Sequence, residues 1–336
     1  MNKITAAFIA FTALVVMILV SCMWPVWRDS ANPENSIWCA QLAWLIVAVC
    51  LIVFLMAISA GVTKRLLGFL INERNLMSLA RFQMIFWTVI ILSAFLVVAL
   101  ARVVSKKDHP LEIVVDQKLW ALLGISLTSL VGTSLINSTK TSKNPDNQEV
   151  DKTAKALVAT NNEPAPANSA APAAVAAATA VQQAADASAK AKTVAAELTA
   201  DPTAVAAAAA AAKQAADTAV VAKTASVADV VNDNKQGTLY ANPSINDASF
   251  SDMFEGDEVG NAAYIDLAKA QMFFFTIIVG LSYVFLLLSQ TMVDLAIAPE
   301  KVNALPVLSA GMIALLGISH AGNLAGKTAD RTKLQT

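Results

Sequence analysis

Long apolar runs alternate with short polar segments along most of this chain, and six runs are long enough to cross a lipid bilayer. A helix needs about 20 mostly apolar residues to do so. Helices satisfy their backbone amides internally, as a bilayer requires. The pattern therefore predicts an all-α polytopic membrane protein. The six predicted spans are residues 5–23, 40–60, 83–101, 119–136, 271–293 and 305–323.

Two short sequences recur within this pattern and indicate a duplicated two-helix hairpin. Residues 79–88 read LARFQMIFWT and return as LAKAQMFFFT at 267–276. The motif ALLGIS at 121–126 returns unchanged at 314–319. Each first motif opens an apolar run, and each second motif lies in the next run. With the topology predicted below, both hairpins run in the same direction, so they are parallel repeats and not the inverted repeats of many transporters.

Composition agrees with a membrane protein, because apolar residues make up 56% and charged residues 15%. Most Lys and Arg of the connecting segments lie on one side of the predicted spans, which is expected to be the cytoplasmic side. Both termini are then predicted inside, in a bacterial inner (cytoplasmic) membrane. The predicted inside charges are Lys3, Lys64, Arg65, Arg74, Arg81, Lys140, Lys143, Lys269, Lys327, Arg331 and Lys333; the outside charges are Arg28, Arg102, Lys106, Lys107, Lys118 and Lys301.

The first run has two interpretations. Leu19-Val-Ser-Cys22 follows a short basic start and an apolar stretch, which is the pattern of a bacterial lipoprotein signal. Cleavage there would place lipid on Cys22 and leave five spans. The apolar stretch is long for a signal peptide, which favours a retained first helix. Cys39 and Cys50 lie in the second run without metal-ligand spacing, and they are interpreted as apolar fillers.

The chain divides into six segments by composition, with a cytoplasmic insert between the two hairpins. Alanine is the strongest helix former, and Asp201-Pro202 is typical of a helix start, so two helices are expected in the alanine-rich part. These helices either stay solvated or pack against each other or against other copies. The segments are an N-terminal hairpin and basic loop at 1–77, the first repeat hairpin at 78–136, a flexible linker at 137–171, the alanine-rich helical insert at 172–232, an acidic juxtamembrane segment at 233–266, and the second repeat hairpin with a basic tail at 267–336.

The acidic segment mixes aromatic and acidic residues just ahead of the fifth span. Its sequence FSDMFEGDE at 250–258 predicts a short amphipathic helix with Phe250, Met253 and Phe254 on one side. Its negative charge complements the basic loop 64–81, which is predicted on the same side of the membrane. We therefore expect these two segments to be in contact.

Polar residues recur in pairs at the start of the repeated hairpins. Arg81 and Lys269 are expected to reach lipid headgroups, with a ring of charge at a pore mouth as the alternative. The amides of Gln83 and Gln271 lie deeper and should bond across helices. Two hydroxyls further along, on Thr88 and Thr276, can bond back to their own helix.

The second helix of each hairpin is rich in small and hydroxyl-bearing residues. Spacing of four residues between small side chains is typical of closely packed membrane helices. The same helices could instead line water in a channel, which can use hydroxyl groups without charges. The residues proposed for helix packing or pore lining are Gly124, Ser126, Thr128, Gly132, Gly317, Ser319, Gly322 and Gly326, with Ser129, Thr133 and Asn323 beside them.

The sequence assembles no catalytic set, phosphate-binding glycine loop or metal site. The two histidines, His109 and His320, are expected on opposite sides of the membrane. Acids that would mark an ion relay are missing from the centres of the predicted spans, which argues against an ion-coupled transporter. The expectation is a non-enzymatic protein without cofactor, metal or nucleic acid. It would contact membrane lipid, self-associate as a scaffold or assembly module, and offer its insert to a cytoplasmic protein. The alternative is an oligomeric ion or small-solute channel lined by the fourth and sixth spans.

The paired motifs Gln-Met-x-Phe-aromatic-Thr and Leu-Leu-Gly-Ile-Ser resemble a hairpin that recurs in uncharacterised bacterial multi-span membrane proteins. The resemblance covers roughly residues 78–136 and 250–327. It implies a bacterial membrane protein and brings no activity with it.

Overall fold

The computed structural model describes residues 3–23, 32–106, 108–160, 172–196 and 202–335. Over these residues the chain is helical, with isolated β-bridges and no extended strand. It forms two compact units. The apolar unit comprises Met1–Asn72, Met77–Leu135 and Leu267–Thr328, and the insert unit comprises Glu73–Leu76, Ile136–Asp266 and Ala329–Thr336.

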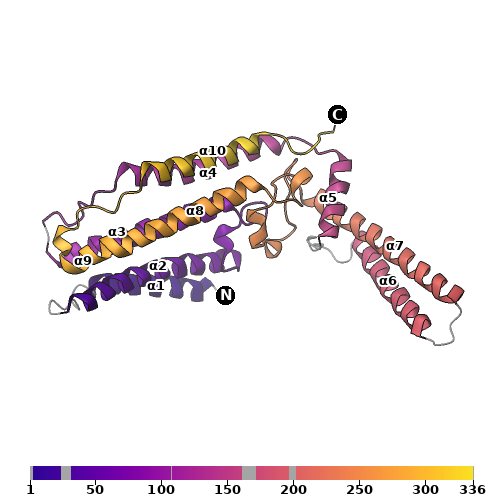
Figure 1. The fold of residues 1–336 in the computed structure, drawn as a ribbon, viewed down its shortest axis with the longest axis horizontal. Helices are drawn as coiled ribbons and strands as arrows, with labels where there is room; N and C mark the ends of the chain where they lie inside the picture. Colours follow the sequence, from indigo (N-terminus) through magenta and orange to yellow (C-terminus); the bar gives the residue numbers. More distant parts are fainter. Residues whose placement is uncertain (1–2, 24–31, 107, 161–171, 197–201, 336) are drawn as a thin grey trace. The chain divides into compact units, whose positions relative to one another are not determined.

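The apolar unit contains most of the long apolar helices (Figure 1). Five helical stretches of the described chain are long and apolar enough to cross a membrane: α1 at Lys3–Met23, α2 at Pro33–Thr63, α3 at Leu79–Val104, α4 at Gln117–Lys140, and Leu267–Ile297, which joins α8 at Leu267–Leu286, a π-helical turn η6 at Leu287–Thr291 and α9 at Met292–Ile297.

The sixth predicted span falls on α10, at Ala310–Thr328. This helix is not among the five, because it carries His320, Asn323 and Lys327 within its 19 residues. The preceding residues 302–309 are not helical, so the regular part of the predicted span is shorter than its apolar run.

The π-helical turn between α8 and α9 anchors α2. The amide of Gln41 donates to the carbonyl of Leu288 at 3.1 Å. A π-helical turn disturbs the regular ladder of helical hydrogen bonds, and such turns are often found at functional positions. Around this point Trp87, Tyr283 and Met292 are buried in one continuous apolar core.

Arg102 ties together the loop that follows α3. Its side chain is buried, and its two terminal nitrogens donate to the carbonyls of Glu112 at 2.7 Å and His109 at 3.1 Å. Further along the same loop, Val114 pairs with the segment ahead of α10 through Asn303 and Leu305. Arg102, which the sequence predicts in an outer loop, is therefore buried, and its hydrogen bonds hold that loop together.

The insert unit has three helices, α5 at Asn147–Ala159, α6 at Pro172–Ala196 and α7 at Pro202–Asn234. Helices α6 and α7 form a hairpin and lie side by side (Figure 1). Helix α5 lies where the sequence predicts a flexible linker. Asp146 caps its start by accepting from the Gln148 amide at 3.1 Å. Its buried residues Val150, Ala154 and Leu157 recur every three or four positions, so α5 has an apolar face that stabilises it. Part of the predicted linker, 161–171, lies outside the described residues.

The acidic segment forms short 3₁₀ turns where an amphipathic helix is predicted. The turns are η3 at Ile245–Asp247, η4 at Phe250–Met253 and η5 at Val259–Asn261. The third residue of each turn accepts, through its side chain, a hydrogen bond from the backbone amide just before that turn, which caps the start of the turn. Met253 is therefore buried while Phe250 is exposed, and the two do not share a face.

The core of the insert unit is a second apolar cluster. It brings together residues from α5, α7, the acidic segment and the short stretch Glu73–Leu76. Its members include Leu76, Val150, Leu157, Val227, Val231, Tyr240 and Val259.

Candidate functional site

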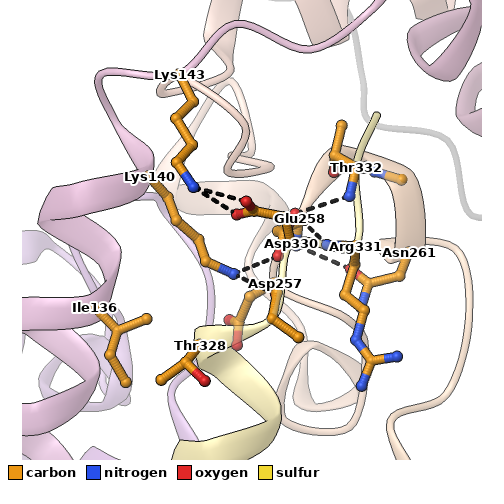
Figure 2. A network of polar contacts seen from close by, with 12 residues as sticks. Ile136, Lys140, Lys143, Asp257, Glu258, Asn261, Thr328, Asp330, Arg331 and Thr332 are labelled. Atoms are coloured by element: carbon orange, nitrogen blue, oxygen red, sulfur yellow. Dashed lines mark hydrogen bonds and ion pairs between the residues drawn. The ribbon is translucent and has the colours of Figure 1, made fainter. Parts of the chain in front are cut away.

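The carboxylate of Glu258 connects three parts of the insert unit (Figure 2). It forms a salt bridge with Lys140, the last residue of α4, and both side chains are less than 5% exposed. The Lys140 ammonium also donates to the carbonyl of Ala329 at 2.9 Å. A buried charge pair of this kind is stable only when further hydrogen bonds complete it.

The other oxygen of Glu258 holds the C-terminal tail. It accepts hydrogen bonds from the backbone amides of Arg331 at 2.9 Å and Thr332 at 3.0 Å. The tail returns a bond, because the Thr332 hydroxyl accepts from the amide of Gly260 at 2.9 Å. One carboxylate thus joins the end of α4, the acidic segment and the tail.

A second, more exposed pair lies beside this cluster (Figure 2). Lys143 donates to both carboxylate oxygens of Asp330, at 2.9 and 2.7 Å, and each side chain is about one-third exposed. The hydrogen bond from Lys143 lowers the pKa of Asp330 below its usual value. Exposed pairs contribute little to stability, so this one is a useful reference for the buried pair.

Arg74 makes the contact that the sequence predicts between the basic loop and the acidic segment. Its guanidinium donates to Asp257 Oδ1 at 2.7 Å, to the Asp257 carbonyl at 2.8 Å and to the Tyr240 carbonyl at 3.0 Å. The Arg74 side chain is only 5% exposed. Burial, followed by the charges of nearby acids, raises the pKa of Tyr240 above its usual value.

The equivalent polar residues of the two repeats differ in their burial and in their hydrogen bonds. Gln83 bonds across helices, donating to the hydroxyl of Thr276 at 2.6 Å, and that hydroxyl donates to the Met272 carbonyl. The corresponding residues Gln271 and Thr88 are both exposed, and Thr88 donates back to its own helix. The charged members of the pairs, Arg81 and Lys269, are both at least partly buried. Arg81 donates to the carbonyl of Ile71 at 2.7 Å, and Lys269 is buried.

Helices α4 and α10 lie beside each other in the same direction. A Cβ on Gly132 would lie 3.2 Å from Leu324, and a Cβ on Gly317 would lie 3.7 Å from Ile125. The other small residues face elsewhere: Gly124, Gly322 and Gly326 have open space beside them, and Thr128 is exposed. The chain therefore uses only part of its small-residue faces for its own packing.

Several polar groups of these helices are enclosed without a hydrogen-bond partner in the described part of the chain. Enclosed polar groups normally bind a partner or water. A water-filled path would supply such partners, as would polar groups on another molecule. The side-chain atoms are those of Ser126, Ser129, Thr133, Ser319, His320 (Nδ1) and Asn323 (Oδ1).

The remaining candidate residues are dispersed. Cys22 lies half-buried in the last turn of α1, and Cys39 and Cys50 are also half-buried. Within the described ranges, no three His, Cys, Asp or Glu side chains are grouped in a way that could hold a metal ion.

Comparisons with known proteins give no relative: no protein family, curated protein or solved structure matches this chain. Its class rests on its own features. Over its described residues it is a helical protein with five helical stretches long and apolar enough to span a membrane, and with a folded insert.

Proposed function

We propose that this chain is a non-enzymatic, self-associating bacterial inner-membrane protein that acts as a scaffold or assembly module. The apolar unit would anchor it in the bilayer, and the insert unit would lie in the cytoplasm. The observation that supports this most is the Lys140–Glu258 cluster. It binds the end of a candidate span, the acidic segment and the tail into one body, so the insert is a built domain and not a loose loop.

The hairpin of α6 and α7 is the part of the insert best suited to a protein partner. Its side chains are small, and valines remain exposed on both helices, among them Val181, Val220 and Val221. Two helices that meet through alanine present flat surfaces that another helix can approach closely. A cytoplasmic partner with an apolar helix face would fit such a surface.

Light scattering on the full chain, purified in a mild detergent, tests the self-association. The expected result is a mass of two or more chains. A second preparation, in which residues 172–218 are replaced by a Gly-Ser linker so that the core residues Val227 and Val231 stay, should keep the same number of chains, since the apolar unit is the proposed site of association. A monomeric full chain would contradict the proposal.

A channel is the second candidate, favoured by the enclosed polar atoms on α4 and α10. Single cysteines at Ser126, Thr133, Ser319 and Asn323 would distinguish the two. Labelling of this row in membranes by a water-soluble, membrane-impermeant thiol reagent would favour the channel. No labelling, with labelling of an exposed control such as Ser188→Cys in α6, would favour dry packing and the scaffold.

A further inference from the structure

Helices α3 and α8 carry the repeated motif, and they pack through different faces of it. Phe86 of α3 lies against Gly280 of α8, where an added Cβ would be 2.2 Å from the ring. Gln83 of α3 donates to Thr276 of α8 at 2.6 Å. In the shared numbering of the motif, Gln83 and Phe86 correspond to Gln271 and Phe274 on α8. Thr276 and Gly280 correspond to Thr88 and Leu92 on α3.

The face of α8 that corresponds to the packed face of α3 is open. Gln271 is exposed, and the apolar residues that follow it form an exposed stripe along the helix. Their positions on α3 are occupied by half-buried or buried residues such as Phe86, Ile90 and Val97. The stripe consists of Phe274, Ile278, Leu281 and Phe285, each at least 58% exposed.

The face of α3 that corresponds to the packed face of α8 is a groove. The cavity has a volume of about 500 Å³, and α3, α4 and the loop between them form its walls. The α3 residues in its wall correspond, one for one, to Thr276, Val279, Gly280 and Tyr283 of α8. All four of those are buried. The α3 residues of the wall are Thr88, Ile91, Leu92 and Phe95.

We propose that the groove on α3 receives the exposed face of α8 from a second copy of this chain, so that the contact already made between the two repeats is repeated between copies. This inference rests on the proposed self-association and names the surface that carries it. A contact that joins two different faces is heterologous, and heterologous contacts close into rings when the rotation between copies allows. The α3 and α8 axes run parallel, so such a ring would surround an axis along the helices (Figure 1).

A polar pair distinguishes this occupant from lipid. Thr276 donates to the Met272 carbonyl and accepts from Gln83. Thr88 makes the same bond to its own helix, to the Met84 carbonyl at 2.7 Å, and Thr88 lies in the groove wall. The Gln271 amide of a neighbouring copy would supply the matching donor. An acyl chain would leave that amide without a partner in the bilayer, which is unfavourable.

One position departs from the pattern. Where Phe86 meets a glycine, Phe274 of the neighbour would meet Leu92, whose side chain is about half exposed. The open volume of the groove provides room for the ring beside that leucine. The contact between copies is therefore expected to be less close than the contact within the chain.

Cross-linking between two differently tagged copies tests the surface. Both copies have the native cysteines replaced by alanine; one carries Leu92→Cys and the other Phe274→Cys. A short thiol cross-linker should join them into a species that carries both tags. The matched control pairs Leu92→Cys with Phe8→Cys, which is similarly exposed but lies on α1. That pair should stay unlinked.

The substitution Gln271→Leu gives a second readout that does not depend on cross-linking. This substitution makes the exposed face more apolar. It should nevertheless weaken association about fivefold, because one interhelical hydrogen bond worth about 1 kcal/mol is lost. A lipid-facing role would instead leave association unchanged.

The outcomes separate this inference from the proposed function. Oligomers without the 92–274 cross-link would overturn the inference and leave self-association through another face. A monomeric chain would overturn both. A monomer that retains phospholipid in native mass spectrometry, with less retained after Leu92→Trp, would assign the groove to an acyl chain and overturn the second copy as its occupant.

Discussion

Removing one partner of the Lys140–Glu258 pair should release the C-terminal tail. Both side chains are less than 5% exposed, and loss of one charge leaves the other buried without its partner. Such a loss typically costs about 3–5 kcal/mol, which is a large share of the roughly 5–15 kcal/mol that stabilises a typical domain. Glu258→Gln keeps the shape of the side chain, so its effect would report the charge and the acceptor strength and not a cavity.

Hydrogen exchange at the amides of Arg331 and Thr332 measures this effect directly, because both donate to Glu258. In the full chain in detergent, Glu258→Gln or Lys140→Ala should speed exchange at these two amides by about two to four orders of magnitude, from the 3–5 kcal/mol above.

Lys143→Ala is the control, since it removes the same kind of side chain from an exposed pair. Exposed pairs contribute about 0–1 kcal/mol, so exchange at the tail should change by less than about tenfold. Equal effects of Lys140→Ala and Lys143→Ala would refute the reasoning. The double substitution Lys140→Met with Glu258→Leu should recover part of the lost stability, because it leaves no buried charge.

Three further substitutions test other contacts. Gly237→Ala places a Cβ 2.2 Å from the Lys140 carbonyl oxygen, at a residue with a φ of +63°. Thermal unfolding should show a loss of stability of about 1–3 kcal/mol. Gly322→Ala, which places its Cβ in open space, should show no such loss. Gly280→Leu overpacks the contact with Phe86 and should cost about 1–3 kcal/mol, with recovery when Phe86→Ala is added. The raised pKa of Tyr240 favours its neutral form in the fold, so stability in denaturant should be full below the ordinary value of 10.0 and fall as pH rises above it; Tyr240→Phe should remove that fall.

The sequence predicted the long helices well, because apolar runs of this length have few other structures open to them. The positions of α1, α2, α3, α4 and α8 follow from that pattern alone. The bounds of α10 are harder to predict, because His320 and Asn323 interrupt the apolar run. The helix also begins later than the run does.

Partners remote in sequence could not be predicted in the same way. The charge of the basic loop suggested a contact with the acidic segment, but only the fold selects Arg74 and Asp257 from several candidates. Nothing local indicates that Glu258 would bind the amides of the tail, because those donors are backbone groups that every residue carries. Helix α5 is hard to predict from the sequence, because its short apolar face lies next to residues typical of linkers.

The dependence of the insert unit on the tail has a consequence for synthesis on the ribosome. Glu258, whose carboxylate accepts from the Thr332 amide, is synthesised 74 residues before Thr332. At 5–20 residues per second, the interval is roughly 4–15 s. During that time the buried lysine and carboxylate lack the bonds from Ala329, Arg331 and Thr332, and the insert stays incomplete. A chain truncated before these residues would leave its polar cluster open, so the insert unit can be completed only after α10 has been made.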